Sequence, residues 1–107
     1  MKIPKQWYYF IKVFKKRYQS EIVADNIRVF QNEKAIEECY TTYEFEEYLP
    51  NYFPIADDSG GQVAVITTDE NNTKVYQTSY GTLMEEDMEV LASNLQDWME
   101  ANFPFSN

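Results

Sequence analysis

Residues 52–68 constrain this chain most, because two apolar runs lie on either side of a short polar segment with two adjacent glycines. The second run, residues 63–68, is nearly continuous and rich in β-branched side chains, which is typical of a central strand. The first run, residues 52–56, contains Pro54, and proline in a sheet is confined to an edge or a bulge. The pattern predicts two strands that follow one another in the sheet.

The segment between these runs, Asp57-Asp58-Ser59-Gly60-Gly61, has two interpretations. Its acids could hold calcium, but neither they nor Asp69-Glu70 have the ligand spacing of a twelve-residue calcium loop. Aspartate and serine side chains also bond back to nearby backbone amides, and glycine supplies positive φ. We therefore interpret the segment as a turn, and we expect neither a metal ion nor a cofactor.

Apolar residues recur every three or four positions in two segments, which predicts two amphipathic helices. The first covers residues 5–19, begins after Pro4, and has this apolar stripe: Trp7, Phe10, Ile11, Phe14 and Tyr18. The second follows a capping box formed by Thr82 and Glu85. Its apolar stripe is Met84, Met88, Leu91, Leu95, Trp98 and Met99.

The remaining segments have weaker secondary-structure patterns. Residues 22–30 predict one strand or a hairpin that turns at Asp25-Asn26, and residues 74–80 predict a returning antiparallel strand. Residues 32–40 predict a short helix capped by Asn32, with Ala35, Ile36 and Cys39 inward. Residues 41–50 are ambiguous between a strand and irregular structure. The expectation is one α+β domain over residues 1–107, with a mainly antiparallel sheet of about four strands flanked by the two amphipathic helices.

Charge is unevenly distributed along the chain. Residues 1–20 carry six basic side chains and no acid, whereas residues 21–107 carry three bases and all 18 acids, for a net charge of -9 overall. An acidic body repels nucleic acid and attracts basic proteins over long range. Acids also keep a protein soluble, so an electrostatic role and plain solubility are both consistent with this charge.

The composition lacks the commonest general base, because there is no histidine. Neither a P-loop nor a G-x-G-x-x-G motif appears among the three glycines. Cys39 is the one cysteine, and we expect a small core residue rather than a nucleophile because no histidine is present to activate it. Carboxylate pairs remain open as catalysts, but 18 acids single out no pair. We expect a protein that is not an enzyme.

Targeting signals are also missing from the sequence. No apolar run is long enough to span a membrane. An N-terminal signal peptide would need an apolar stretch where Lys12, Lys15, Lys16 and Arg17 stand. A single cysteine leaves no internal disulfide, as is common in a reducing compartment. We expect a cytoplasmic protein without a transmembrane segment and without direct nucleic-acid binding.

Several stretches together resemble the SUKH superfamily, the Smi/Knr-like proteins: IPKQWYYFI, IRVF, FPIADDSGGQVAVI, KVYQTSYG and EVLASNLQDWME. In that family a proline followed by an aromatic-bearing helix opens the core, a glycine turn feeds the central strand, and a further helix closes the fold. The opening matches Pro4, Tyr8 and Phe10. The turn matches Pro54, Ile55, Asp57, Gly60 and Gly61, and the closing helix matches Ala92, Ser93, Leu95 and Trp98.

The resemblance implies an α+β fold and a non-enzymatic role. Many bacterial members resemble immunity proteins that bind and neutralise a partner toxin, often a nuclease. An acidic protein suits such a partner, because nucleases are basic where they hold phosphate. The candidate contact residues are acids in the glycine turn, the next hairpin tip and the segment before Pro50: Asp57, Asp58, Asp69, Glu70, Glu44, Glu46 and Glu47. Each of these acids is also typical of an ordinary solvated surface.

A second function is open at this stage. The chain could be a regulatory or scaffold module whose basic N-terminal helix engages a membrane surface or an acidic partner. The aromatic stripe of that helix needs burial, however, and packing on the chain's own core is the commoner way to achieve it. We therefore favour a core helix.

Overall fold

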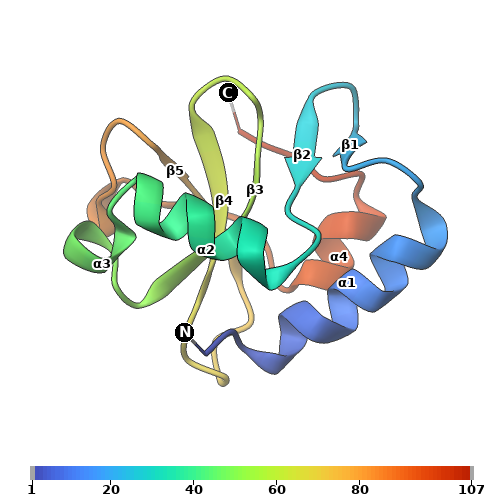
Figure 1. Ribbon diagram of the computed structural model, residues 1–107, viewed down its shortest axis with the longest axis horizontal. Coiled ribbons are helices and arrows are strands. Elements are labelled where there is room, and N and C mark those ends of the chain that lie inside the picture. The colour runs from blue at the N-terminus through green and yellow to red at the C-terminus, as the bar shows by residue number, and fades with distance from the viewer. Residues whose placement is uncertain (1, 107) are drawn as a thin grey trace.

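The computed structural model describes residues 2–106 and has an α+β fold, in which one antiparallel sheet is combined with helices (Figure 1). The strands are β1 (Ile22–Val23), β2 (Ile27–Val29), β3 (Tyr52–Asp57), β4 (Gln62–Thr67), β5 (Val75–Ser79) and β6 (Glu89–Ala92). The helices are α1 (Lys5–Arg17), α2 (Glu33–Thr42), α3 (Phe45–Tyr48), the 3-10 helix η1 (Glu85–Asp87) and α4 (Leu95–Glu100). None of the helices in residues 2–106 has the length and apolar character needed to cross a membrane.

The sheet has six strands rather than the expected four or so. They lie side by side in chain order, and every neighbouring pair is antiparallel. The hairpin alternative for residues 22–30 is confirmed, with positive φ at Ala24 and Asp25 in its turn. The sixth strand, β6, was not predicted from the sequence. Both β1 and β6 are edge strands, which are short and half exposed, so their sequence signals are weak.

The central hairpin β3–β4 is buried on both faces. In each of these strands the first residue is half-buried and the next five are buried. Side chains alternate between the faces of a strand, so consecutive burial means that both faces are covered. One cover is α2, which crosses in front of β3 and β4 in Figure 1. The register shifts between Pro54 and Ala56, which confirms the predicted bulge.

The turn between β3 and β4 uses its own polar side chains, as predicted. Asp58 Oδ1 accepts hydrogen bonds from the amides of Gly60 (2.8 Å) and Gln62 (3.0 Å). Gly61 has φ +105°, and Ser59 has φ 62°. Glycine tolerates such a backbone because it has no Cβ. The positive φ explains the glycine at position 61, and the hydrogen bonds of Asp58 stabilise the turn without a ligand.

Helix α1 is a core helix, which confirms that prediction. Trp7, Phe10, Ile11 and Phe14 are buried, and the Phe10 ring lies 6.4 Å from the ring of Trp98 in α4. At the C-terminal end of α1, Arg17 forms an ion pair with Glu100 of α4. Because the aromatic stripe is covered by the protein itself, only the basic outer face of α1 is free to meet other molecules.

The segment between α2 and β3, which the sequence left ambiguous, forms the short helix α3. Glu44 adopts a left-handed conformation (φ 59°), which separates α2 from α3. Phe45 then enters the core fully buried, and its ring stacks on Tyr40 at 5.7 Å. Helix α2 itself agrees with the prediction, since Asn32 Oδ1 accepts a hydrogen bond from the amide of Ala35 at 2.8 Å.

The predicted start of the C-terminal helix at Thr82 is wrong. Residues 84–92 form η1 and β6, and the helix begins only at Leu95. The helical period of the apolar residues is misleading, because Met84 is 45% exposed and Met88 and Leu91 are only half-buried, so these three form no continuous buried stripe. Strand β6 instead pairs with the largely buried β5 and so completes its backbone hydrogen bonds. The real cap is Asn94, whose Oδ1 accepts from the amide of Asp97 at 2.8 Å.

We predict that a substitution at the observed cap, Asn94, destabilises the protein more than one at the expected cap, Thr82. Asn94→Ala removes a hydrogen bond from the first turn of α4 and should lower the free energy of unfolding by about 1 kcal/mol. Thr82→Ala alters an exposed side chain and should change it by less than about 0.5 kcal/mol. Urea denaturation measures both values. A larger loss for Thr82→Ala than for Asn94→Ala would contradict the assignment.

Candidate functional site

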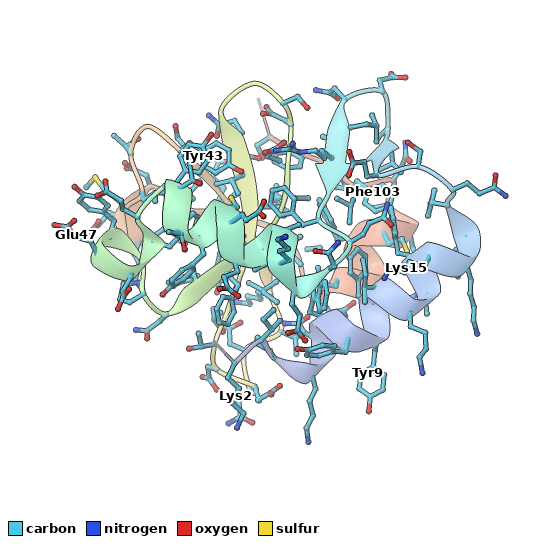
Figure 2. The ribbon with its side chains drawn as sticks, viewed as in Figure 1. Lys2, Tyr9, Lys15, Tyr43, Glu47 and Phe103 are labelled. Atoms are coloured by element: carbon cyan, nitrogen blue, oxygen red, sulfur yellow. The ribbon has the colours of Figure 1, made fainter. Side chains whose placement is uncertain are left out.

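Six exposed glutamates lie on α2, on α3 and between these helices, and they form what we call the acidic face: Glu33, Glu37, Glu38, Glu44, Glu46 and Glu47. They point outward because Ile36, Cys39 and Phe45 occupy the inward positions of the same helices. Lys34 is the one base in residues 33–48, so the segment has a net charge of -5. Figure 2 shows Glu47 projecting from α3 at the left edge of the molecule.

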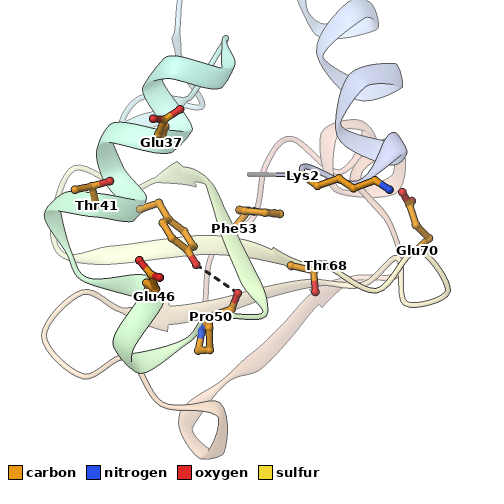
Figure 3. Close-up of a pocket in the computed structure, with 9 residues that line it drawn as sticks. Lys2, Glu37, Thr41, Glu46, Pro50, Phe53, Thr68 and Glu70 are labelled. Atoms are coloured by element: carbon orange, nitrogen blue, oxygen red, sulfur yellow. Dashed lines mark hydrogen bonds between the residues drawn. The ribbon is translucent and has the colours of Figure 1, made fainter.

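A hollow of about 630 Å³ borders the acidic face. Glu37, Thr41 and Glu46 lie on one side of it and Lys2 and Glu70 on the other (Figure 3). The remaining lining residues are Tyr40, Pro50, Phe53 and Thr68. The hollow therefore combines three carboxylates with aromatic surface, the two kinds of group that attract a cationic side chain.

The aromatic part of this hollow is held in place from α2. The rings of Tyr40 and Phe53 lie 5.8 Å apart, and the Tyr40 hydroxyl donates to the carbonyl oxygen of Pro50 at 3.4 Å. Burial, with a smaller contribution from the charge of Glu46, raises the pKa of Tyr40. Tyr40 thus stays a neutral hydrogen-bonding group at physiological pH.

Glu70 has a structural task besides lining the hollow. Its two carboxylate oxygens lie 3.1 and 3.2 Å from the amide nitrogen of Lys5 and accept hydrogen bonds at the start of α1. A carboxylate at this end of a helix also complements the helix dipole. Asp69, its neighbour, is exposed, and its Oδ1 accepts from the amide of Asn71 at 2.9 Å.

The structure divides the predicted contact residues between two ends of the sheet. Glu44, Glu46 and Glu47 line a second hollow of about 330 Å³ next to the first, and Glu46 and Glu70 share the first. Asp57 and Asp58 lie at the opposite end of β4, which is about 20 Å away at the usual rise per residue. In Figure 1 the β3–β4 turn is at the top and the β4–β5 loop at the bottom.

Asp57 is a buried residue and presents no free carboxylate to a partner. It is 4% exposed, and its Oδ2 accepts from the Tyr80 hydroxyl at 2.9 Å and from the Arg28 guanidinium at 3.0 Å. Its Oδ1 accepts from the amide of Ser59 at 3.1 Å. We therefore remove Asp57 from the candidate contact residues. Asp58 is half-buried, and its Oδ1 is already occupied by the turn.

The contacts of Asp57 extend to α2. Cys39 Sγ lies 3.2 Å from the Tyr80 hydroxyl, and the ring of Tyr43 stacks on that of Tyr80 at 3.8 Å. Burial raises the pKa of the Cys39 thiol from 9.0 to about 11. Burial also raises the pKa of Tyr80, with contributions from Cys39 and Asp57. A thiol with so high a pKa is a poor nucleophile. The contacts of Cys39 and Tyr43 with Tyr80 instead join α2 to the sheet.

Three glutamates of the acidic face were not predicted from the sequence as contact residues. Glu33, Glu37 and Glu38 are absent from the predicted contact residues, although the same pattern already assigns Ile36 and Cys39 to the inward side of their helix. That assignment leaves Glu37 outward, because neighbouring positions of a helix face different directions. Within residues 2–106 no three cysteine or acidic side chains lie close enough together to hold a metal ion.

Comparison with known proteins identifies the family. The sequence model of the SMI1 / KNR4 family (SUKH-1) matches residues 1–101, nearly the whole chain. The chain belongs to the SUKH-1 family. No curated protein matches it. The family assignment confirms the SUKH resemblance, and proteins of the SUKH family are associated with protein partners.

We predict that Asp57 of this SUKH-1 protein is needed for stability. Asp57→Asn leaves Arg28, Tyr80 and Ser59 without their carboxylate and should lower the free energy of unfolding by about 2–4 kcal/mol. Most of that loss comes from the buried contacts, since Arg28 is half exposed and its ion pair is screened. Asp69→Asn is the control and should change stability by less than about 0.5 kcal/mol. Equal effects of the two in urea denaturation would contradict the assignment.

The raised pKa of Cys39 predicts a loss of stability at alkaline pH. The folded state keeps the thiol protonated up to about pH 11, whereas the unfolded chain releases the proton near pH 9.0. Unfolding is therefore favoured increasingly as the pH rises through this window. Urea midpoints measured from pH 8 to pH 11 should fall, and Cys39→Ala should fall less steeply. Parallel declines of the two proteins would show that Cys39 does not contribute.

Proposed function

We propose that this SUKH-1 protein is a non-enzymatic immunity-type protein, which neutralises a partner toxin by binding it through the acidic face. The observation that carries the proposal is the group of six exposed glutamates of the acidic face beside a hollow to which Glu70 adds one further carboxylate. Membership of a family associated with protein partners supports it. The buried single cysteine fits a cytoplasmic site of action.

The charge of the acidic face points to a basic partner. Complementary charge speeds encounter and fixes the orientation of two proteins, with a strong dependence on salt. Toxins that cut nucleic acid are basic where they hold phosphate, and an acidic protein surface covers such a site as a nucleic acid would. A nuclease is therefore the toxin class that this surface suits best.

The arrangement of reactive groups supports binding rather than catalysis. The chain has no histidine, and its one thiol is buried with a high pKa. The buried carboxylate of Asp57 is occupied by Arg28 and Tyr80. The remaining acids of the candidate set line open hollows or the turn, where carboxylates stay in contact with water. A general acid or base usually needs a more enclosed position than these.

The regulatory alternative has less support. Lys12, Lys15 and Lys16 are exposed on α1 and could meet an anionic surface. The apolar side of α1, however, is buried in the core, so the helix cannot insert that side into a membrane while the protein stays folded. For a contact with another molecule, α1 retains only its outer face, which carries these lysines together with the exposed Tyr8 and Tyr9.

Charge reversal on the acidic face tests the proposed function. The tagged protein is used to capture its partner from host lysate, and the partner is identified, purified and titrated calorimetrically over a salt series. Glu46→Lys and Glu47→Lys should each weaken binding at least about tenfold at low salt and less at high salt, because ions screen exposed charges. Glu46→Lys should also remove protection of cells that express the toxin.

Glu21→Lys is the matched control, since it makes the same change in net charge at an exposed position outside the acidic face. It should leave the affinity unchanged within about twofold. A partner bound equally well at all salt concentrations would contradict the proposal. So would capture of lipid alone, or of no protein partner at all.

A further inference from the structure

A third hollow, of about 430 Å³, lies on the other side of α3, between this helix and η1. Pro50 lines both this groove and the hollow of Figure 3, so the two are neighbours. Glu46 of α3 lines the hollow of Figure 3, whereas Glu47 and Tyr48 line this groove, so α3 lies between them. We call this third hollow the α3–η1 groove. Its walls come from segments far apart in the sequence, residues 47–52 and 83–86, which no local pattern brings together.

The α3–η1 groove contains exposed apolar side chains. Tyr48 of α3 is 55% exposed and Met84, directly before η1, is 45% exposed. Both line the groove, whose inner wall includes the buried Leu83 and the half-buried Tyr52. Aromatic and methionine side chains in a hollow, surrounded by polar groups, are typical of protein-binding surfaces.

The rim of the groove is acidic. Glu47, Glu85 and Glu86 line it, and its lining includes no lysine or arginine among residues 2–106. Glu85 is oriented by the hydroxyl of Tyr52, which donates to its Oε1 at 2.9 Å. The groove thus combines the exposed apolar side chains of Tyr48 and Met84 with three carboxylates. This arrangement fits a partner side chain that is apolar itself and flanked by positive charges.

We propose that the α3–η1 groove is the anchor point of the partner, and that it receives an apolar side chain from a segment with lysine or arginine on both sides. The inference rests on the proposed function and extends it, because the glutamates of the acidic face steer a partner by charge, whereas this groove adds exposed apolar side chains beside them. Contacts that carry most of the binding energy cluster where apolar side chains enter a pocket from which the surrounding contacts exclude water. Complementary charges nearby fix the orientation of the two proteins. Tyr48 and Met84 are the residues placed for that contact.

Two defined peptides probe the groove while the partner is still unidentified. The first is acetyl-Lys-Lys-Phe-Lys-Lys-amide, and the second replaces its phenylalanine by glycine, so the peptides have equal charge. Each is titrated into the full ¹⁵N-labelled chain at low salt and followed by NMR. The phenylalanine peptide should shift amides of residues 47–52 and 83–86 and should bind at least about fivefold more tightly than the glycine peptide.

Matched variants locate the contact. Tyr48→Ala should weaken binding of the phenylalanine peptide at least about threefold, and Tyr9→Ala should not change it, although Tyr9 on α1 is even more exposed at 71%. Glu86→Lys should weaken both peptides, whereas Glu21→Lys should have no effect beyond about twofold. Figure 2 shows Tyr9 projecting from the lower edge of the molecule. Equal affinities of the two peptides, or shifts spread over all acidic segments, would overturn the inference.

Binding of the purified partner by the same variants tests this inference separately from the proposed function. Weaker partner binding by both Glu46→Lys and Tyr48→Ala supports both. If Glu46→Lys weakens the complex and neither Tyr48→Ala nor Glu86→Lys does, the groove is not the anchor while the proposed function stands. If neither charge reversal nor Tyr48→Ala affects partner binding, both are overturned.

Discussion

The buried carboxylate of Asp57 is the interaction on which the arrangement of the molecule depends. A charged group in the interior is costly unless its hydrogen-bonding capacity is filled. Asp57 is filled by Arg28 of β2, Tyr80 after β5 and the amide of Ser59 in the turn. These partners join three strands of the sheet around one residue. Through the contact of Tyr80 with Cys39, α2 is also held over the sheet.

The contact of Cys39 with Tyr80, together with the burial of Ile36, determines which side of α2 faces water. With Ile36 and Cys39 turned toward the sheet, the glutamates of the same helix must point outward. The left-handed Glu44 then starts α3, and Phe45 fixes α3 to the core. The acidic face and the three hollows beside α3 therefore result from the core packing. A partner that binds there meets a surface whose shape is already set before contact, which lowers the entropy cost of binding.

Local signals in the sequence were enough for the parts of the fold that local interactions determine. The β3–β4 hairpin with its bulge and turn, α1 and the Asn32 cap of α2 all follow from residues within a few positions of one another. The family resemblance, which the comparison confirms, also came from such local motifs. Residues 84–92 could not be assigned correctly, because a helical period and an edge strand compete there. Pairing with β5 decides the outcome, and that contact is not local.

The site was predictable only in part for the same reason. Glu46 and Glu47 are exposed on the outer side of α3, and Glu44, directly before α3, is exposed as well. The burial of Asp57 depends on Arg28 and Tyr80, which lie 29 and 23 residues away in sequence. Likewise, the α3–η1 groove needs residues 83–86 to stand next to α3, which the expected helix would have placed elsewhere.

The most direct test of the account is hydrogen exchange of the protein with and without its purified partner. The account predicts slower amide exchange on binding in residues 33–52 and 83–86, with α1 and the β3–β4 turn unchanged. Protection confined to α1 or to residues 57–61 would contradict the claim that the acidic face and the neighbouring groove receive the partner.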